Sequence, residues 1–485
     1  MKFFNFTALP LAAALLLAGC ATALPELPQQ TAPPARFKED GNNRWTTAAP
    51  AEAQDRGTWW KAFADPTLDG LVERAGLHNT SIHEAAARLA QARALLRNAD
   101  ADRLPQIGLG ASAVRQAGAN TQGGATPGTL TSAGANLSYE LDLFGKLARA
   151  SDAAALDAQG REALLQSTRL LVQADTAQTY LALRALDAER ALVRETVSAH
   201  ANTLRLTERR YQAGDIAELD VARVQTELAS TESEALALDR RRAELEHALA
   251  VLVGEAASNF SLSVADWTTA LPQIPAGIPG TVLARRPDVA AAQNAMLAAQ
   301  ARVGVAKTAW FPSVSLTAAG GFASPEISDL FKWSARAWSV GALLSLPIFD
   351  GGRREAGVQG AQAQLDAALA SYRGQVLAAF RDVEDQLSTL RLLQDQSEAQ
   401  GRAVGSASRA TVLSDSRYRN GLVSQLELLD ARRSELRNRR QALQVKATQY
   451  QATVGLVRAL GGGWDAAGTK VGESTEPADK QVAAR

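Results

Sequence analysis

The sequence is poor in the residues that mark several common classes of protein. Cys20 is the only cysteine among 485 residues, so a disulfide within the chain and a cysteine-rich zinc cluster are both excluded. Aromatic residues make up 5% of the chain, whereas Ala, Leu, Gln and Arg recur throughout, which is typical of long helices in close contact. Basic and acidic residues number 51 each, so the total charge does not indicate a nucleic-acid partner.

Motifs for catalysis and energy supply are also missing. The four histidines, His78, His83, His200 and His247, are scattered, and the first two are spaced so that they do not share a helix face. No GxxxxGK loop that could bind a nucleotide phosphate is present. We therefore predict that the chain is not an enzyme, holds no metal or cofactor, and has no energy source of its own.

The N-terminus predicts export and lipidation. Lys2 precedes an apolar run over residues 9–17 that is too short to span a bilayer, which indicates a signal peptide over residues 1–19. The LAGC sequence ending at Cys20 resembles the bacterial lipobox, whose cysteine becomes the acylated first residue of a lipoprotein. In lipoproteins an aspartate in the next position favours the inner membrane, so Ala21 points to the outer membrane. An ordinary signal peptide with a chance cysteine is the alternative.

An internal repeat organises the rest of the chain. RYQAGDIAEL at residues 210–219 returns as RYRNGLVSQL at residues 417–426, 207 residues later. In each copy a glycine, Gly214 or Gly421, lies between two long periodic segments, where it can end one helix and let the next begin. We therefore predict a duplicated architecture in which each half contains a helical hairpin.

The distribution of proline sets the lengths of the helices. No proline lies between Pro127 and Pro272, or between Pro347 and Pro477. In these gaps we predict helices over 146–211 and 353–418, each ~100 Å long, and over 216–253 and 423–460, each ~57 Å long. Shorter helices of ~35 Å are predicted over 81–103 and 288–310. A 57 Å helix stacked on a 35 Å helix nearly matches a 100 Å helix, so all six could form one helical wall.

These features divide the chain into six segments. We predict the signal peptide (1–19), a proline-rich lipidated tether (20–57), a first structural repeat (58–254), a crossover linker (255–285), a second structural repeat (286–464) and a disordered polar tail (465–485).

Each repeat also contains two short segments with the alternation of a β-strand. LPQIGLGA at 104–111 matches FPSVSLTA at 311–318, again 207 residues apart. Alternation also marks residues 132–141 and 338–346, with loops at 115–129 and 324–334, so we predict two hairpins and four strands. Four strands cannot close a barrel, so several chains would have to contribute to a transmembrane barrel with Trp310, Phe311 and Trp338 at its interfaces. A small soluble sheet that caps a helical bundle is the alternative.

Several motifs together resemble the TolC-like outer membrane factors, in particular the lipoprotein branch with NodT-type and OprM-type efflux channels. They are the lipobox, WWKAFADPTLDGLVERA from Trp59, YELDLFGK from Tyr139, RRPDV from Arg285, AKTAWFP from Ala306, LPIFDGGRR from Leu346 and both RY..G turns. The resemblance implies an α+β membrane protein with an internal duplication. Three chains would form a twelve-stranded transmembrane β-barrel, four strands from each, above a periplasmic α-barrel. The glycine-rich loop at 115–129 is unusual for the family.

The resemblance also assigns roles to the helix reversals. The family docks a periplasmic adaptor protein at these tips, which here are Gly214, Asp215, Ile216, Gly421, Leu422 and Val423; alternatively the glycines only stop helices. Glu208 and Asp415 are equivalent in the repeat and could form a ring of carboxylates in a trimer. The resemblance implies a periplasmic aperture of Glu208, Arg209, Asp415, Arg417 and Arg419; a solvated outer helix face is the alternative.

The resulting functional hypothesis is a passive exit duct in the outer membrane. It would carry small toxic compounds and work with a periplasmic adaptor and an inner-membrane pump of the resistance-nodulation-division type, in contact with outer membrane lipid and not with nucleic acid. An exit duct for type I protein secretion has the same architecture. A lipid-anchored coiled-coil scaffold in the periplasm would need the helices but not the strands. The cargo is not evident from the sequence.

Overall fold

The computed structural model describes residues 25, 37–39, 57–117, 127–272, 274, 282 and 285–462. The predicted signal peptide, the predicted lipidation site Cys20 and the predicted tail lie outside these residues. Most of the predicted tether and part of the crossover linker lie outside them as well.

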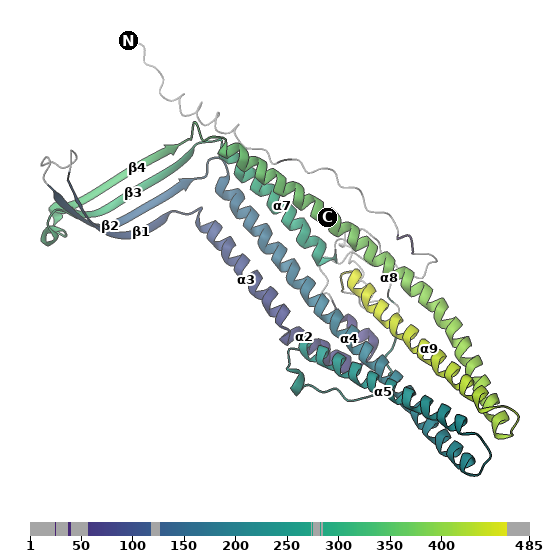
Figure 1. Cartoon of the computed structure of the whole chain (residues 1–485). Helices are drawn as coiled ribbons and strands as arrows, with labels where there is room; N and C mark the ends of the chain where they lie inside the picture. The colour runs from purple at the N-terminus through teal and green to yellow at the C-terminus, as the bar shows by residue number, and fades with distance from the viewer. Residues whose placement is uncertain are drawn as a thin grey trace, which may run out of the picture. The chain divides into compact units, whose positions relative to one another are not determined.

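Long helices and four strands make up most of the described chain (Figure 1). The helices are α2 (Pro66–His78), α3 (Thr80–Ala101), α4 (Lys146–Gln212), α5 (Glu218–Leu252), α7 (Pro287–Thr308), α8 (Arg353–Arg419) and α9 (Gln425–Ala459). The strands are β1 (Gln106–Gln116), β2 (Gly128–Leu141), β3 (Ser313–Ser324) and β4 (Arg336–Ser345). Short 3₁₀ turns are η1 (Trp59–Phe63), η2 (Ala257–Asn259), η3 (Ile327–Asp329) and η4 (Trp333–Ala335).

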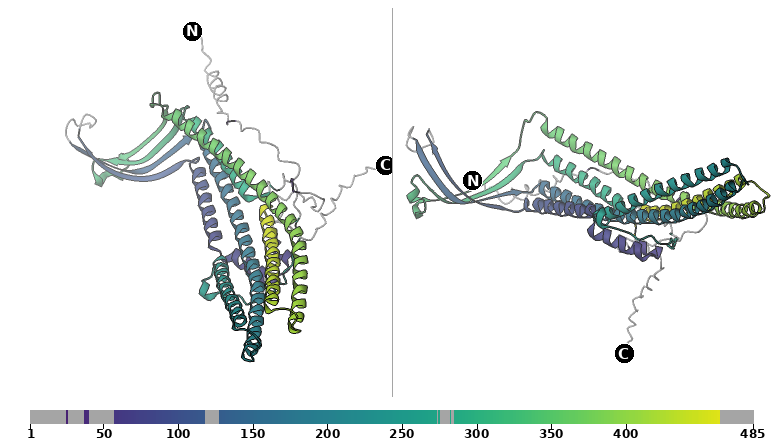
Figure 2. Two further views of the ribbon diagram at one scale, coloured as in Figure 1. Left: turned by 45° about the vertical axis from the view of Figure 1, so that its right-hand side comes forward. Right: turned by 60° about the horizontal axis from the view of Figure 1, so that its bottom comes forward.

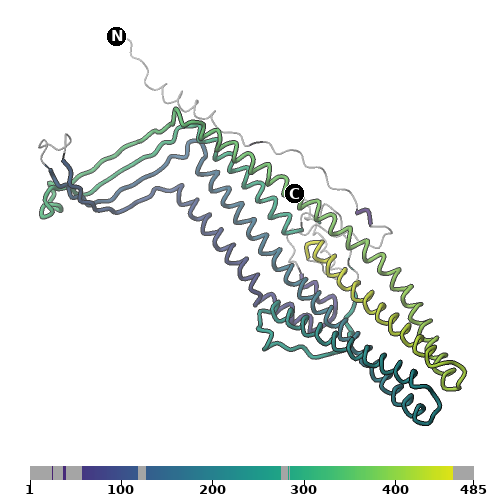
Figure 3. The backbone as a smooth tube through the Cα atoms, viewed as in Figure 1, coloured from purple at the N-terminus to yellow at the C-terminus, as the bar shows by residue number. Residues whose placement is uncertain are grey.

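The six helices and four strands expected from the sequence are all present. The helices come in pairs of equal length: α4 and α8 have 67 residues each, α5 and α9 have 35, and α3 and α7 have 22. Figure 3 follows the chain as it reverses between α4 and α5 and again between α8 and α9. Both strands of the first hairpin extend into the stretch predicted as a loop over residues 115–129. The ladder between β1 and β2 continues to the pair Gln116 and Gly128.

Both reversals use the same backbone geometry. Gly214 has a φ of 80° and Gly421 has a φ of 71°, in the left-handed region that favours glycine. The amide of Asp215 donates to the carbonyl of Arg210 at 2.9 Å, and the amide of Leu422 donates to the carbonyl of Arg417 at 2.9 Å. These are the six-to-one bonds of a Schellman motif, so the glycines end α4 and α8 as predicted.

The strands form one antiparallel sheet in the order β1-β2-β3-β4. Its register places five rows of mostly apolar residues on one face, and we call this the apolar face. Along the rows from the helix end to the far end, β2 contributes Leu141, Tyr139, Leu137, Ala135 and Ala133, β3 contributes Val314, Leu316, Ala318, Gly320 and Phe322, and β4 contributes Leu344, Ala342, Val340, Trp338 and Arg336. The opposite face is small and mostly polar, with Asn136, Ser138, Thr317 and Ser339 among its residues.

Within the part of the chain that the structure describes, neither face of the sheet packs into a buried core. All ten residues of β4 are exposed, and ten of the eleven in β1 are exposed. Within the described residues, neither the outer edge of β1 nor that of β4 has a strand partner. Open edges and an uncovered apolar face are unusual for a finished fold, because they invite pairing with another chain.

The chain divides into two compact units, and each draws on both halves of the sequence. One unit contains the sheet with residues 84–166 and 287–377; its core includes Met296, Ala299 and Val303 from α7 and Leu365 from α8. The other unit contains α2, α5, α9 and the remaining parts of α4 and α8. In this second unit α4 and α5 lie side by side, as do α8 and α9, in both views of Figure 2. Among the described helices, none is both long and apolar enough to cross a membrane.

Candidate functional site

The two helix reversals present an exposed edge. Gly214, Asp215, Gly421 and Leu422 are exposed, and Ile216 and Val423 at equivalent positions are half-buried. The reversals are also linked: Arg210 donates to the Tyr418 hydroxyl at 3.3 Å, and its guanidinium lies 5.9 Å from the centre of the Tyr418 ring. The repeated Arg-Tyr pair therefore joins α4 to α8 close to both predicted docking turns.

Only part of the predicted aperture is brought together. Asp415 pairs with Arg419 at 2.7 Å, and Arg417 pairs with Glu427 of α9 at 3.6 Å. Glu208 is half-buried and Arg209 is exposed, and neither makes an ion pair within the described residues. The structure adds Arg432 of α9, which pairs with Asp415 at 3.1 Å and donates to the Thr203 hydroxyl at 2.9 Å.

Arg432 was missed because the repeat carries no signal for it. The residue 207 positions earlier is Gln225, so the comparison of the two halves gives no basis for choosing it. The arginine-rich stretch ARRSELRNRR at residues 431–440 was the available indication, but such stretches usually lie on solvated helix faces.

The packing above the reversals is polar. Gln425 is buried and donates to the Thr207 hydroxyl at 3.0 Å, and His200 and Thr231 are buried nearby on α4 and α5. His200 is 3% exposed, and its Nδ1 has no hydrogen-bond partner within the described residues. Burial lowers the pKa of His200, as do Arg432 and Arg433 of α9, whereas Glu227 of α5 opposes that shift. A groove of about 640 Å³ is lined by His200 together with Glu227, Glu234, Arg433, Arg437 and Arg440.

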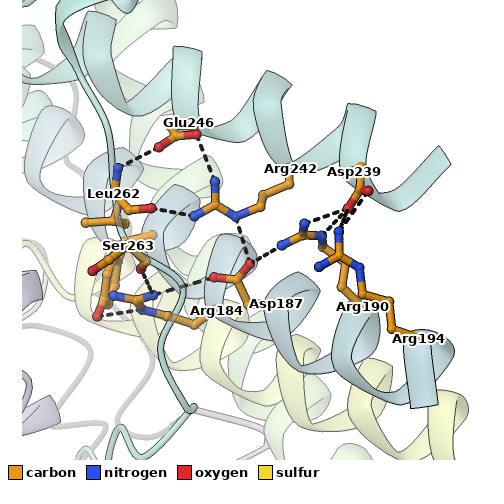
Figure 4. Close-up of polar contacts among 10 residues, drawn as sticks. Arg184, Asp187, Arg190, Arg194, Asp239, Arg242, Glu246, Leu262 and Ser263 are labelled. Carbon is orange, nitrogen blue, oxygen red and sulfur yellow. Dashed lines mark hydrogen bonds and ion pairs between the residues drawn. The ribbon is translucent and has the colours of Figure 1, made fainter. Parts of the chain in front are cut away.

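Further along α4 a network of ion pairs fastens the segment that follows α5 (Figure 4). The Asp187 side chain is 1% exposed and pairs with Arg184 at 3.5 Å, Arg190 at 3.0 Å and Arg242 of α5 at 2.8 Å. Arg184 also donates to the carbonyl of Ser263 at 2.9 Å, and Arg242 donates to the carbonyl of Leu262 at 2.5 Å. Residues 262–263 are thus bound to both helices of the first hairpin.

Two other carboxylates complete this network. Glu246 accepts from the amide of Leu262 at 2.5 Å and pairs with Arg242 at 2.8 Å. Asp239 accepts from Arg190 at 2.7 Å and from Arg194 at 2.9 Å. Desolvation of Asp239 opposes ionisation, but the hydrogen bonds from Arg190 and Arg194 outweigh it, and the pKa of the carboxyl is lowered.

A second polar cluster holds the start of α2. Asp65 accepts from the amides of Thr67 and Leu68 at 3.0 and 3.2 Å, so it caps the helix, and its other oxygen accepts from the Tyr180 and Thr269 hydroxyls, both at 2.8 Å. Burial raises the pKa of Tyr180, which keeps the phenol protonated and able to donate. Within the described residues no group of three or more His, Cys, Asp or Glu could hold a metal ion.

Comparison with known sequences identifies the family. The model of the outer membrane efflux protein family matches residues 71–255 and 278–462, which is most of the chain. The chain belongs to this family. Its members are channel proteins, and the chain is accordingly an outer membrane channel component of an efflux system.

Individual relatives match over nearly the whole length. The pyoverdine export outer membrane protein OpmQ of Pseudomonas putida is 33% identical over 467 residues, which cover 94% of this chain and 97% of the relative. The outer membrane protein OprJ of Pseudomonas aeruginosa is 33% identical over 464 residues, covering 93% and 95%. The solved outer-membrane channel OprN is 31% identical with a TM-score of 0.84, covering 91% of this chain and 99% of that one.

Proposed function

We propose that three copies of the chain assemble into one channel, with four strands from each copy in a closed twelve-stranded β-barrel. The observation that carries this proposal is the sheet itself: among the described residues it has an apolar face, no buried core on either side and two outer edges without a strand partner. The five rows of the apolar face extend ~26 Å at ~3.3 Å per residue, close to the ~25 Å apolar band of outer membrane barrels. Closure with neighbouring copies would satisfy both edges.

Below the barrel, the helices of both repeats would surround a tunnel through the periplasm. The repeats would comprise residues 58–254 and 286–464, as predicted from the sequence. The matched lengths of α4 with α8 and of α5 with α9 support this arrangement, because equal elements can alternate around one wall. Acylation of Cys20 would add a lipid anchor, for which the LAGC sequence is the support.

The partners would be a periplasmic adaptor and an inner-membrane pump. The exposed turns at Gly214 and Gly421 suit adaptor docking, since both present backbone and short side chains at the end of a hairpin. Small toxic compounds remain the proposed cargo; the relative OpmQ is named for export of pyoverdine. Near-complete coverage by efflux proteins supports this reading over type I protein secretion, and the four-stranded sheet argues against a scaffold.

Two measurements test the channel. The purified protein should migrate on a gel as a heat-modifiable trimer, and it should form pores in planar bilayers. A monomer that aqueous buffer extracts without detergent would rule out the barrel.

The aperture proposal is tested on the same pores. Glu208→Ala together with Asp415→Ala should raise the single-channel conductance, because it removes six carboxylates from a narrow ring and releases the ion pairs of Asp415 with Arg419 and Arg432. Asp366→Ala, on a helix position outside the proposed ring, is the control. Unchanged conductance in the double variant would remove Glu208 and Asp415 from the aperture.

A further inference from the structure

The two ends of the apolar face each carry an arginine stacked on a tryptophan. At the helix end, the Arg354 guanidinium lies 4.6 Å from the centre of the Trp310 ring. At the far end, the Arg336 guanidinium lies 4.4 Å from the centre of the Trp333 ring. Stacking on an aromatic ring covers one face of the guanidinium and leaves its N–H groups free at the edge.

The two arginines differ in their ion pairs within the described residues: Arg354 has a carboxylate partner and Arg336 has none. Arg354 is bound to Asp350 at 2.7 Å, and hydrogen bonds from Arg354 and Gly352 lower the pKa of that carboxyl even though desolvation opposes the shift. Arg336 makes no ion pair within the described residues. Lys332, close by in sequence, is already bound to Asp329 at 2.6 Å. The far-end arginine is therefore oriented by Trp333 but has no carboxylate partner among the residues that the structure describes.

Exposed aromatic side chains lie on the same side of the sheet as Arg336. Phe331, Trp333 and Trp338 are 74%, 75% and 77% exposed. Arg336 lies opposite Phe322 in the strand ladder, and Trp338 lies two residues further along the same face of β4. Tryptophan with an adjacent cation is typical of the boundary between hydrocarbon and headgroups.

We propose that Arg336, stacked on Trp333 and flanked by Trp338, binds a phosphate of a phosphorylated glycolipid in the outer leaflet of the outer membrane. The guanidinium edge matches phosphate in a two-pronged geometry, and the exposed rings accept the adjoining acyl chains. The leaflet follows from the strand direction: β1 and β3 run from the helices toward this end, so with the helices in the periplasm it faces outward. The inference rests on the proposed barrel.

The test uses the full-length trimer in nanodiscs of phosphatidylcholine that contain diphosphorylated lipid A. The protein is recovered in mild detergent, and lipid A molecules retained per trimer are counted by native mass spectrometry. Arg336→Gln should lower the apparent affinity about tenfold, the effect of losing one charge-assisted contact. The apparent affinity of Arg336→Lys for lipid A should lie between those of the wild type and Arg336→Gln, because lysine keeps the charge but lacks the two-pronged geometry of the guanidinium.

Matched variants separate this site from general charge effects. Arg353→Gln removes an exposed arginine at the helix end and should leave lipid A retention unchanged. Trp333→Ala should weaken retention while Arg336 is still present, because the guanidinium loses its support. Equal retention by wild type and Arg336→Gln, or an equal loss in Arg353→Gln, would overturn the proposal.

Two further measurements identify the lipid that is bound and distinguish failure of this site from failure of the proposed barrel. In discs with phosphatidylglycerol in place of lipid A, Arg336→Gln should have little effect; an equal effect there would overturn the choice of an outer-leaflet glycolipid. Each preparation is also tested for pores in planar bilayers. If the wild-type protein neither retains lipid A nor forms pores, the proposed barrel is wrong. If it forms normal pores but retains lipid A equally well with and without Arg336, only this lipid site is wrong.

Discussion

Two neighbouring stretches of α4 contact the same helices in different ways. The first stretch comprises residues 181–193. Its Leu186 and Val193 pack against Leu238 of α5 and Leu436 of α9, and its Asp187 forms ion pairs with three arginines. We call it the apolar stretch. In the second, residues 196–207, threonine hydroxyls accept from polar groups of α9: Thr207 from the Gln425 amide and Thr203 from the Arg432 guanidinium. We call it the polar stretch.

The difference bears on where the second unit can open. Hydrogen bonds can be exchanged for bonds to water at a small net cost, whereas exposing an apolar side chain or an unpaired buried charge is expensive. The polar stretch lies next to the helix reversals, so local opening should begin there and stop at the apolar stretch.

The largest effect should come from Asp187→Ala. The substitution leaves Arg184, Arg190 and Arg242 without their shared carboxylate, and Arg184 and Arg190 are buried, so we expect a loss of about 3–5 kcal/mol of stability. Thermal unfolding in detergent measures it. Asp430→Ala, which removes an exposed partner of Arg433, should change the midpoint little. Similar midpoints for both variants would mean that the network does not secure the apolar stretch.

Next in size is the contrast between an apolar and a polar truncation. Leu186→Ala should cost about 2–4 kcal/mol, because it leaves a cavity among buried side chains. Gln425→Ala should cost about 1–2 kcal/mol, because one buried hydrogen bond is lost. Hydrogen exchange should show faster opening throughout α4 and α5 in the first variant and only near the reversals in the second. The reverse pattern would contradict the division into two stretches.

Acid should affect the polar stretch selectively. Burial and the neighbouring Arg432 and Arg433 lower the pKa of His200 below its ordinary 6.5, so the unfolded chain takes up the proton first. Stability should be full above pH 6.5 and should decline as the pH falls from there to the lowered pKa, with no further loss from this group below it. His200→Gln should remove that part of the pH dependence of thermal unfolding, whereas Gln at the exposed His247 should not. A pH profile unchanged by His200→Gln would exclude this group as the source.

The smallest effects concern the two arginines bound to Asp415. Arg432→Gln should cost about 1–2 kcal/mol locally, because Arg432 links α9 to Asp415 of α8 and to Thr203 of α4. Arg419→Gln removes an exposed pair within one helix and should cost less than about 0.5 kcal/mol. Exchange rates at residues 415–425 provide the comparison. Equal rates in both variants would show that Arg432 does not hold the reversal together.

The sequence predicted the elements whose signals are local. The turns at Gly214 and Gly421 depend on one φ angle each, and the strands depend on an alternation that the observed register preserves from Leu141 to Ala133. The domain boundaries, the docking turns and the aperture remain predictions, because a single chain does not test them.

Contacts between helices could not be predicted from the same signals. Asp187 is one of many acidic residues on long helices, and its burial depends on how α4 is rotated against α5. The repeat did not help either, because Gln394 stands where the second half would need a carboxylate. Arg432 was missed for the same reason. Such pairs follow from the rotation and register of helices, which residue spacing along one helix does not fix.

The uncovered sheet also has a consequence for how the protein matures. A lone polypeptide can complete its helices from local contacts, but within the described residues the outer edges of β1 and β4 have no strand partner, and in the proposed barrel other copies supply it. In the proposed trimer, closure of the sheet should therefore be the concentration-dependent last step of biogenesis, and before it the subunit would need shielding from aggregation through those edges.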